Sequence, residues 1–505
     1  MPMNQVNPVK ILTMIAAVFA LYVLPLASQP KEITILHTND MHASFLPHEA
    51  YWVRGNPKPL VGGFNELAFA IDSLRHCRKS TLLLDAGDIM TGNPITDRTF
   101  KGAEGGALIE MLNLMGYEGQ TPGNHDFDIS CSNYLRLKAI ATYPVFSANL
   151  VDEKTGLPVT GKEYVVIEKN GLKIGMFGIM SREFYNLVTA NSTKGIKLLP
   201  PIETAKRLID LLEFQTDLLI AVTHQGVGDD SVLAAETKGI DVIVGGHSHT
   251  RLRRPNNVNG VLIVQAGSNA ENLGILDLTV DKRHHIAKWN GELHQLWYNP
   301  NRGTTVVSAL VDSFKTEIRN EYSEVIGTLS SPWNAANGET AEGYFLADAQ
   351  REAAHADIGF MNNGGIRKRL SPGPITKQDL FEVLPFRNIL TTFSVTGSQI
   401  RAIVLNNIAK RPGILISGID CEWKRDAAGN PEIVKLLVNG NPVSDTATYT
   451  GAASDYMMGE AERYLGIAVP HVTYLTETVF AAVEARVRAD KIVSSNADPR
   501  IKELK

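Results

Sequence analysis

The 505-residue chain contains only three cysteines, Cys77, Cys131 and Cys421, and their spacing matches no metal-binding motif. At most one disulfide can form, and Cys77 with Cys131 is the expected pair if one does; three separate buried thiols are the preferred interpretation. The chain also lacks a basic excess, because its formal net charge is −5. Nothing in its bulk charge therefore indicates a nucleic acid as its partner.

Long apolar runs are absent, except for one near the N-terminus that extends from Ile11 to Ala27 after the basic residue Lys10. One basic residue before an apolar run of about 15 residues is typical of a secretory signal rather than a membrane span. Leu26 or Pro25 occupies the position where cleavage prefers a small residue, so an uncleaved anchor is the alternative. We expect residues 1–28 to be a signal peptide or N-terminal anchor. The mature protein is then periplasmic or at the cell surface, with no stable membrane insertion unless the segment stays uncleaved.

The length predicts two or more domains, and 44% hydrophobic with 20% charged residues is typical of a soluble globular chain. No internal repeat or low-complexity tract is present. A turn-rich break at Asn299–Gly303 precedes a predicted helix over Thr304–Tyr322. We therefore predict a first domain over residues 31–300, a linker helix over 301–322 and a second domain over 323–505.

Short apolar runs that end at glycine, asparagine or aspartate predict buried strands in the first domain. These runs are Ile33–Leu36, Leu82–Leu84, Leu218–Val222 and Val242–Val244. Helical patterns separate them, at Glu66–Arg75, Ala107–Met115 and Ile202–Phe214. Alternating strands and helices indicate a layered α/β sheet, in which ligands collect beyond the carboxyl ends of the strands.

Metal-binding residue types follow these strands in five short motifs. The motifs are Asp40-Met41-His42, Gly87-Asp88, Gly123-Asn124-His125-Asp126, Thr223-His224 and Gly245-Gly246-His247-Ser248-His249. A single Gly-Asp or Thr-His is ordinarily a turn or a strand end, and the polar run before Asn124 is a poor strand signal. All five together favour two adjacent divalent metal ions, which cleave phosphate esters with water.

In this order the motifs resemble those of the calcineurin-like metallophosphoesterases. Three longer motif segments are similar in sequence to the secreted bacterial 5'-nucleotidase family: His37–Asp40, Asp85–Asp88 with Thr91–Pro94, and Gly123–Asp128. Asn362–Arg367 and Leu384-Pro385-Phe386 resemble that family's C-terminal domain. The resemblance covers Glu32 to Leu465. It implies an α/β protein with an N-terminal metallophosphoesterase β-sandwich flanked by helices, a linker helix and a smaller C-terminal α/β substrate-binding domain.

The resemblance also implies the residues of the metal centre. One ion would be held by Asp40, His42 and His249, and the other by Asn124, His224 and His247, with Asp88 bridging both. A mixed nitrogen and oxygen set suits Zn²⁺ or Mn²⁺ and does not choose between them. His125 would stabilise charge on the phosphoryl oxygens and Asp128 would orient it; the alternative for Asp128 is an ordinary helix N-cap.

The implied activity is hydrolysis of a nucleotide phosphate ester to nucleoside and phosphate by a dimetal-activated water. Arg367 would clamp the phosphate, aided by Asn362 and by the backbone at Gly364 and Gly365. Tyr456 matches one of two rings that sandwich the base in the family. No aromatic matches the other in Arg411–Leu415, Glu460–Arg463 replaces a glycine-rich run, and an acid stands at Asn337-Gly338-Glu339 where family members often carry a further arginine.

These departures leave the substrate open. The alternatives are a nucleotide that is held differently and another small anion: a 2',3'-cyclic nucleotide, a UDP-sugar or a sulfur-linked carrier intermediate. A second alternative is a non-catalytic extracellular binding module. Loss of metal ligands would be its signature, yet all seven ligand positions and His125 are filled.

Overall fold

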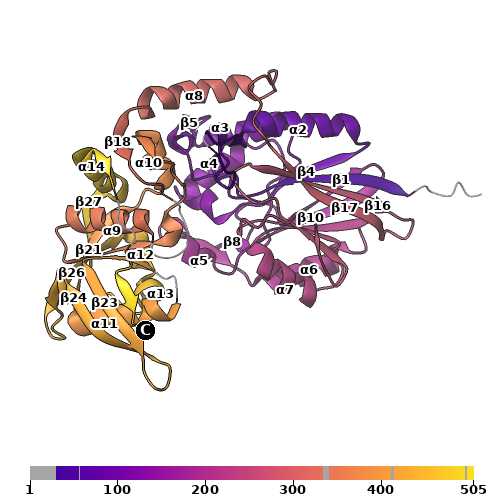
Figure 1. Cartoon of the computed structure of the whole chain (residues 1–505). Coiled ribbons are helices and arrows are strands. Elements are labelled where there is room, and N and C mark those ends of the chain that lie inside the picture. Colours follow the sequence, from indigo (N-terminus) through magenta and orange to yellow (C-terminus); the bar gives the residue numbers. More distant parts are fainter. Residues whose placement is uncertain (1–29, 56, 334–339, 411–413, 495–497, 505) are drawn as a thin grey trace, which may run out of the picture.

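The computed structural model describes residues 30–55, 57–333, 340–410, 414–494 and 498–504 (Figure 1). The predicted signal or anchor, the acid at Asn337-Gly338-Glu339 and part of the Arg411–Leu415 segment lie outside this range. Within it, no helix combines the length and apolar character needed to cross a bilayer.

Two β-sheets packed face to face form the centre of the N-terminal half. The first has the order β17-β16-β1-β4-β7 and the second β14-β15-β13-β12-β10-β9. Their bounds are β1 Lys31–Thr38, β4 Thr81–Asp85, β7 Gly119–Gln120, β9 Tyr164–Lys169, β10 Leu172–Met180, β12 Leu218–His224, β13 Val242–Gly245, β14 Asn256–Val258, β15 Val261–Val264, β16 Asn272–Val280 and β17 Ile286–Gln295. Because β1 pairs in parallel with β4, and β12 with β13, their carboxyl ends lie at one edge of each sheet.

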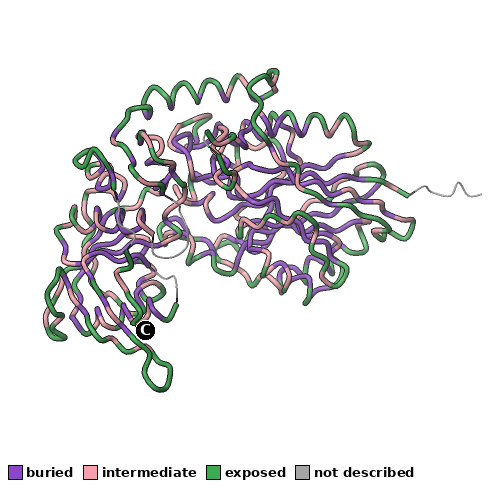
Figure 2. Tube along the Cα trace, in the orientation of Figure 1, coloured by how far each residue is buried: buried purple, intermediate pink, exposed green. Residues whose placement is uncertain are grey.

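Alternating side chains explain this layering. Along β12, Leu218, Ile220 and Val222 pack between the two sheets, while Leu219 and Ala221 pack outward onto helices. Successive strand residues point to opposite faces, so both faces of this strand are apolar and both are buried. Figure 2 shows the strands as the most continuously buried part of the half.

Helices cover both outer faces (Figure 1). The first sheet is covered by α2 Phe64–Cys77, α3 Gly106–Met115 and α8 Ser308–Tyr322, and the second by α6 Pro201–Leu212 and α7 Gly226–Glu236. Shorter elements complete the half: β2 His48–Glu49, β3 Leu60–Val61, η1 Pro94–Asp97, β5 Thr99–Phe100, β6 Ala103–Glu104, η2 Asn124–Phe127, α4 Cys131–Ile140, β8 Leu150–Asp152, α5 Phe184–Leu187 and β11 Ile196–Leu198.

The C-terminal half is built on a sheet of order β22-β19-β26-β21-β27. Its strands are β19 Ile358–Asn362, β21 Ile389–Thr396, β22 Ile414–Ser417, β26 Thr448–Ser454 and β27 Val472–Thr478, covered by α9 Ala341–Ala353, α14 Val479–Asp490 and α11 Gly397–Lys410. The remaining elements are β18 Val325–Leu329, η3 Asn363–Gly365, β20 Gly373–Thr376, α10 Lys377–Val383, β23 Ile419–Arg425, β24 Pro431–Val438, β25 Asn441–Pro442, α12 Asp455–Gly459, α13 Ala461–Leu465, β28 Ile492–Val493 and β29 Ile501–Glu503.

The strands and helices expected in the first domain are all present, and even the polar run before Asn124 forms the short strand β7. The linker helix is shorter than expected, because α8 begins at Ser308 and not at Thr304. Val306, expected on its apolar face, is 64% exposed. The face that does pack, through Val311, Phe314 and Ile318, lies against α2 and belongs to the core that α2 and α3 share.

The cysteines are three separate thiols, as preferred from the sequence. Only Cys421 is buried, whereas Cys77 is exposed at the end of α2 and Cys131 is half-buried at the start of α4. The expectation of three buried thiols was therefore wrong for the first two, because both sit at helix ends that face the surface.

Two valines test the packing between the sheets. Val242 is fully buried in that core and Val232 is 43% exposed on α7. We expect Val242→Ala to lower the free energy of unfolding by about 2 kcal/mol, because it removes buried methyl groups and leaves a cavity. The matched control Val232→Ala should change it by less than about 0.5 kcal/mol. Urea unfolding measures both, and equal effects would contradict the layered core.

Candidate metal centre

The side chains singled out in the sequence come together at the carboxyl ends of strands from both sheets. Asp40 and His42 follow β1, Asp88 follows β4, and Asn124 opens η2 after β7. From the second sheet, His224 is the last residue of β12, and His247 and His249 follow β13.

Backbone conformation aims these side chains. Five of the seven residues have a positive φ: 50° at Asp40, 46° at His42, 58° at Asp88, 77° at His247 and 53° at His249. The left-handed region costs a non-glycine residue about 1–2 kcal/mol, so such residues persist only where surrounding structure enforces them. Here the reversal turns each loop back over its strand, which brings the side chains to a common point.

The first ligand group consists of Asp40, His42 and His249, whose ligand atoms all lie within 4.8 Å of one another. His42 Nε2 is 2.9 Å from His249 Nε2, and His249 Nε2 is 3.5 Å from Asp40 Oδ1. Burial lowers the pKa of His42 and of His249, the latter to about 3, and the nearby Arg367 charge lowers both further. Neutral imidazoles with facing nitrogens are suited to share a cation.

The second group consists of Asp88, His224 and His247, again with ligand atoms within 4.8 Å of one another. His224 Nε2 lies 3.1 Å from Asp88 Oδ2 and 4.0 Å from Asp40 Oδ1, so the two groups adjoin. Burial opposes protonation of His224, but Asp88 and Asp40 raise its pKa to about 10. A metal ion bound here would displace that proton.

The amide of Asn124 completes the donor set. Its Oδ1 is buried and has no hydrogen-bond partner among the described residues. A buried unpaired carbonyl oxygen costs free energy unless something else coordinates it. Together with two carboxylates and four imidazoles, it fits two divalent metal ions that accept mixed nitrogen and oxygen ligands.

His125 lies beside this set without belonging to either group. Its Nδ1 is 2.7 Å from Asp128 Oδ2, which also accepts a 2.7 Å hydrogen bond from Thr91 Oγ1. Burial alone would lower the pKa of His125, but Asp128 and Asp88 overcome this and raise it. Asp128 is not a helix N-cap, because it stands at the C-terminal end of η2.

Arg367 reaches the centre from the C-terminal half. Its Nη2 lies 3.1 Å from His42 Nε2. Phe386 packs beside it, with its ring 5.8 Å from the guanidinium and 5.6 Å from the His125 ring. Phe386 was recognised in a motif of the sequence but was not assigned to the site. Only the fold shows that Phe386 lies beside both Arg367 and His125.

The other expected substrate residues all come from the C-terminal half. Asn362 is buried at the end of β19, and Gly364 and Gly365 form η3 behind it. A Cβ on Gly365 would lie 2.7 Å from Met361 Cε and 3.0 Å from Asn362 Oδ1, so a side chain there would crowd Asn362. Tyr456 is the second residue of α12 and donates its hydroxyl to the Asn186 carbonyl at 3.0 Å, across the contact between the two halves.

Asp126 is a supporting residue that the sequence analysis did not single out. Its carboxylate accepts backbone N–H bonds from Asp88, Ile89 and Met90 at 3.0–3.2 Å and from Gly123 at 2.8 Å. It therefore ties the loop after β4 to the loop after β7. The only sequence signal was its place in the Gly-Asn-His-Asp motif.

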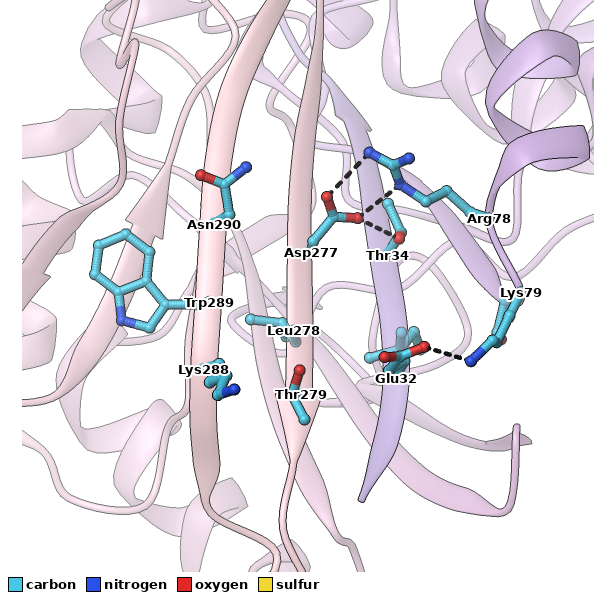
Figure 3. A pocket seen from close by; sticks show the side chains of 12 residues that line it. Glu32, Thr34, Arg78, Lys79, Asp277, Leu278, Thr279, Lys288, Trp289 and Asn290 are labelled. Carbon is cyan, nitrogen blue, oxygen red and sulfur yellow. Dashed lines mark hydrogen bonds and ion pairs between the residues drawn. The ribbon is translucent and has the colours of Figure 1, made fainter. Parts of the chain in front are cut away.

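A cavity of about 820 Å³ opens beside the centre. Its wall includes His42, His249 and Arg367, and it continues between residues 44–60 of the first half and 366–382 of the second. A smaller cavity of about 440 Å³ lies at the opposite end of β1 (Figure 3). Four of its charged residues form ion pairs, Arg78 with Asp277 and Lys79 with Glu32, and its lining contains no residue of the metal groups.

Two family models match the chain. Residues 33–251 match the calcineurin-like phosphoesterases, and residues 325–466 match the C-terminal domain of the 5'-nucleotidases. The first match defines the class: the N-terminal half is a metallophosphoesterase domain, of the kind that binds divalent metal ions. The second match covers much of the C-terminal half, so the chain carries a metallophosphoesterase domain and a domain similar to the C-terminal domain of the 5'-nucleotidases, as its motifs indicated.

Individual relatives are similar to most of the chain. Endonuclease YhcR of Bacillus subtilis is 26% identical over 93% of the chain, which spans only 41% of that relative's length. A 5'-nucleotidase of Diplobatis ommata is 29% identical over 94% of the chain and 90% of the relative. The crystal structure of a 5'-nucleotidase precursor from Thermus thermophilus superposes with a TM-score of 0.80, at 24% identity, over 94% of this chain and 99% of that one. The expected two-domain α/β fold is thereby confirmed.

Metal analysis tests the donor set. Asp88→Ala should bind no more than one Zn²⁺ or Mn²⁺ per chain where the wild type binds two, because its carboxylate offsets the repulsion between neighbouring dications. Asp72→Ala is the matched control, since the Asp72 side chain is 74% exposed on α2. Elemental analysis after gel filtration measures both. Two tightly held ions in Asp88→Ala would contradict the assignment.

Proposed function

We propose that the chain is a metal-dependent phosphohydrolase that releases phosphate from nucleotide phosphate esters, as a 5'-nucleotidase does. One observation carries this proposal: two adjoining ligand groups face an arginine and a histidine that belong to neither group. The pattern of 5'-nucleotidase relatives that cover most of the chain supports the substrate class.

Each metal group has proposed ligands. Asp40, His42 and His249 would hold one ion; Asn124, His224 and His247 would hold the other; Asp88 would bridge both. Zn²⁺ or Mn²⁺ suits this mixed set better than Mg²⁺ or Ca²⁺. Such ions supply Lewis acidity, neutralise charge on the phosphoryl group and lower the pKa of water.

The other side chains then bind and orient the ester. Arg367 presents a planar guanidinium that can hold two phosphoryl oxygens at once. His125 donates its Nδ1–H to Asp128, which fixes the tautomer and leaves Nε2 to face the phosphoryl group. The carboxylates of Asp128 and Asp88 raise the pKa of His125, which favours the protonated ring, and a protonated ring can donate a hydrogen bond from Nε2 to the charge that builds up there. Asn362, Gly364, Gly365 and Tyr456 are proposed to line the rest of the substrate site.

Organisation and location complete the proposal. Residues 31–300 would form the metal-binding domain, 301–322 the linker and 323–505 the substrate domain; α8 and the two family matches support this division. Residues 1–28 would direct export to the periplasm or cell surface, where a small-molecule ester would be the partner. The basic residue and apolar run over Lys10–Ala27 support export.

A substitution at His125 distinguishes metal binding from catalytic turnover. His125→Ala should retain both metal ions and lose about 10²–10³-fold in kcat, because the variant keeps every proposed ligand but lacks the donor to the phosphoryl oxygens. His76→Ala, whose side chain is 75% exposed, is the matched control and should behave as wild type. Phosphate release from AMP measures turnover. Full activity in a metal-loaded His125→Ala protein would refute the role.

A substrate screen decides among the alternatives. Nucleoside monophosphates, 2',3'-cyclic nucleotides and UDP-sugars are assayed with Mn²⁺ and with Zn²⁺, read as released phosphate after a secondary phosphatase where the product is itself an ester. We expect monophosphates to give the highest kcat/KM. A metal-loaded protein that is inert toward all of them would favour a sulfur-linked substrate or a binding module.

A further inference from the structure

The cavity beside the metal centre has an aromatic wall that no part of the proposed mechanism uses. Trp52 lines it and keeps 42% of its surface exposed, although tryptophan ordinarily packs inside a domain. The volume of about 820 Å³ is within the range of small-molecule sites. Because His42, His249 and Arg367 line the same cavity, a molecule with its phosphate at the metal centre can extend to Trp52.

Trp52 packs against a second residue of the cavity wall, Arg251. The Arg251 guanidinium lies over its indole ring, 4.4 Å from the centroid. Arg251 forms an ion pair with the buried Glu271, and His48 Nε2 lies 3.3 Å from another oxygen of that carboxylate. One face of the indole therefore contacts a cation that an ion pair holds in place, and the cation–π contact restrains the ring.

The contact between the two halves engages Tyr456, the other ring proposed to meet the substrate. Tyr456 and Arg463 both donate to the Asn186 carbonyl, at 3.0 and 3.1 Å, and the Tyr464 ring packs edge-on against Tyr456. The segment from Arg411 to Leu415, where a second ring would be needed for a sandwich, contains no aromatic residue. Tyr456 is thus engaged with protein, while Trp52 borders open space.

We propose that Trp52, which packs against Arg251, is the subsite that stacks the planar aromatic part of the leaving group. This inference rests on the proposed function and deepens it, because it selects phosphate esters whose leaving group carries a flat ring, such as a purine nucleoside. Stacking tolerates any base, since every nucleobase has a π-face. The site then recognises aromatic leaving groups in general rather than one base.

Two substrates and two tryptophans test the subsite. Trp52→Ala should raise KM for AMP about tenfold, the size of one lost base–aromatic contact, with kcat within about twofold. KM for glycerol phosphate, which has no ring, should not change. Trp52→Phe should recover most of the AMP affinity. Trp297→Ala is the matched control: Trp297 is also 42% exposed and its ring lies 6.5 Å from Trp52, but it is not part of the cavity wall.

Equal losses for AMP and glycerol phosphate in Trp52→Ala would mean a structural role and would overturn the proposal. A tenfold effect on AMP from Tyr456→Ala and none from Trp52→Ala would also overturn it, by placing the base on the other side.

Adenosine binding to the Mn²⁺-loaded protein, measured by calorimetry, separates this inference from the proposed function. Weaker binding in Trp52→Ala supports the subsite even if the wild type releases no phosphate, in which case only the proposed function fails. Adenosine binding that is absent, or that does not depend on Trp52, overturns the subsite whatever the turnover.

Discussion

Two buried carboxylates, Asp40 and Asp88, impose the constraint on which the rest of the centre depends. Both are at most 1% exposed, and removing a charge from water is costly unless opposite charge compensates it. The protein places His224 between them, at 4.0 and 3.1 Å, and adds Arg367 from the other half. The carboxylates and the polar side chains gathered around them suit the centre to divalent cations rather than to a hydrophobic ligand.

Hydrogen bonds and ion pairs near the centre tie the two halves together. Asn93, just after the Asp88 loop, donates to Glu382 at 2.5 Å, and Glu382 also pairs with Lys368, the neighbour of Arg367. Arg387 bridges to Asp97 and Glu104 of the first half. These ion pairs therefore hold the segment that carries Arg367 beside the metal groups. The open cavity lies next to that segment.

Much of this could be predicted from sequence because it is local. The apolar run of β12 marks a strand buried on both faces, and the residue types in Asp40-Met41-His42 or Gly245–His249 are chemically suited to metals. What could not be predicted rests on distant partners. The exposure of Val306, the closing of Tyr456 onto Asn186 and the four N–H groups gathered by Asp126 all require another segment to be in place.

The sequence by itself determined where the strands and helices of the first domain lie, the layered α/β class and the kinds of ligand available, since hydrophobic periodicity and side-chain chemistry are properties of short segments. Only the tertiary structure decided that His42 meets His249, that His224 stands between two carboxylates, and that Trp52 borders the open side. Those outcomes depend on left-handed turns at the loops and on packing between segments roughly 200 residues apart, where no local preference acts.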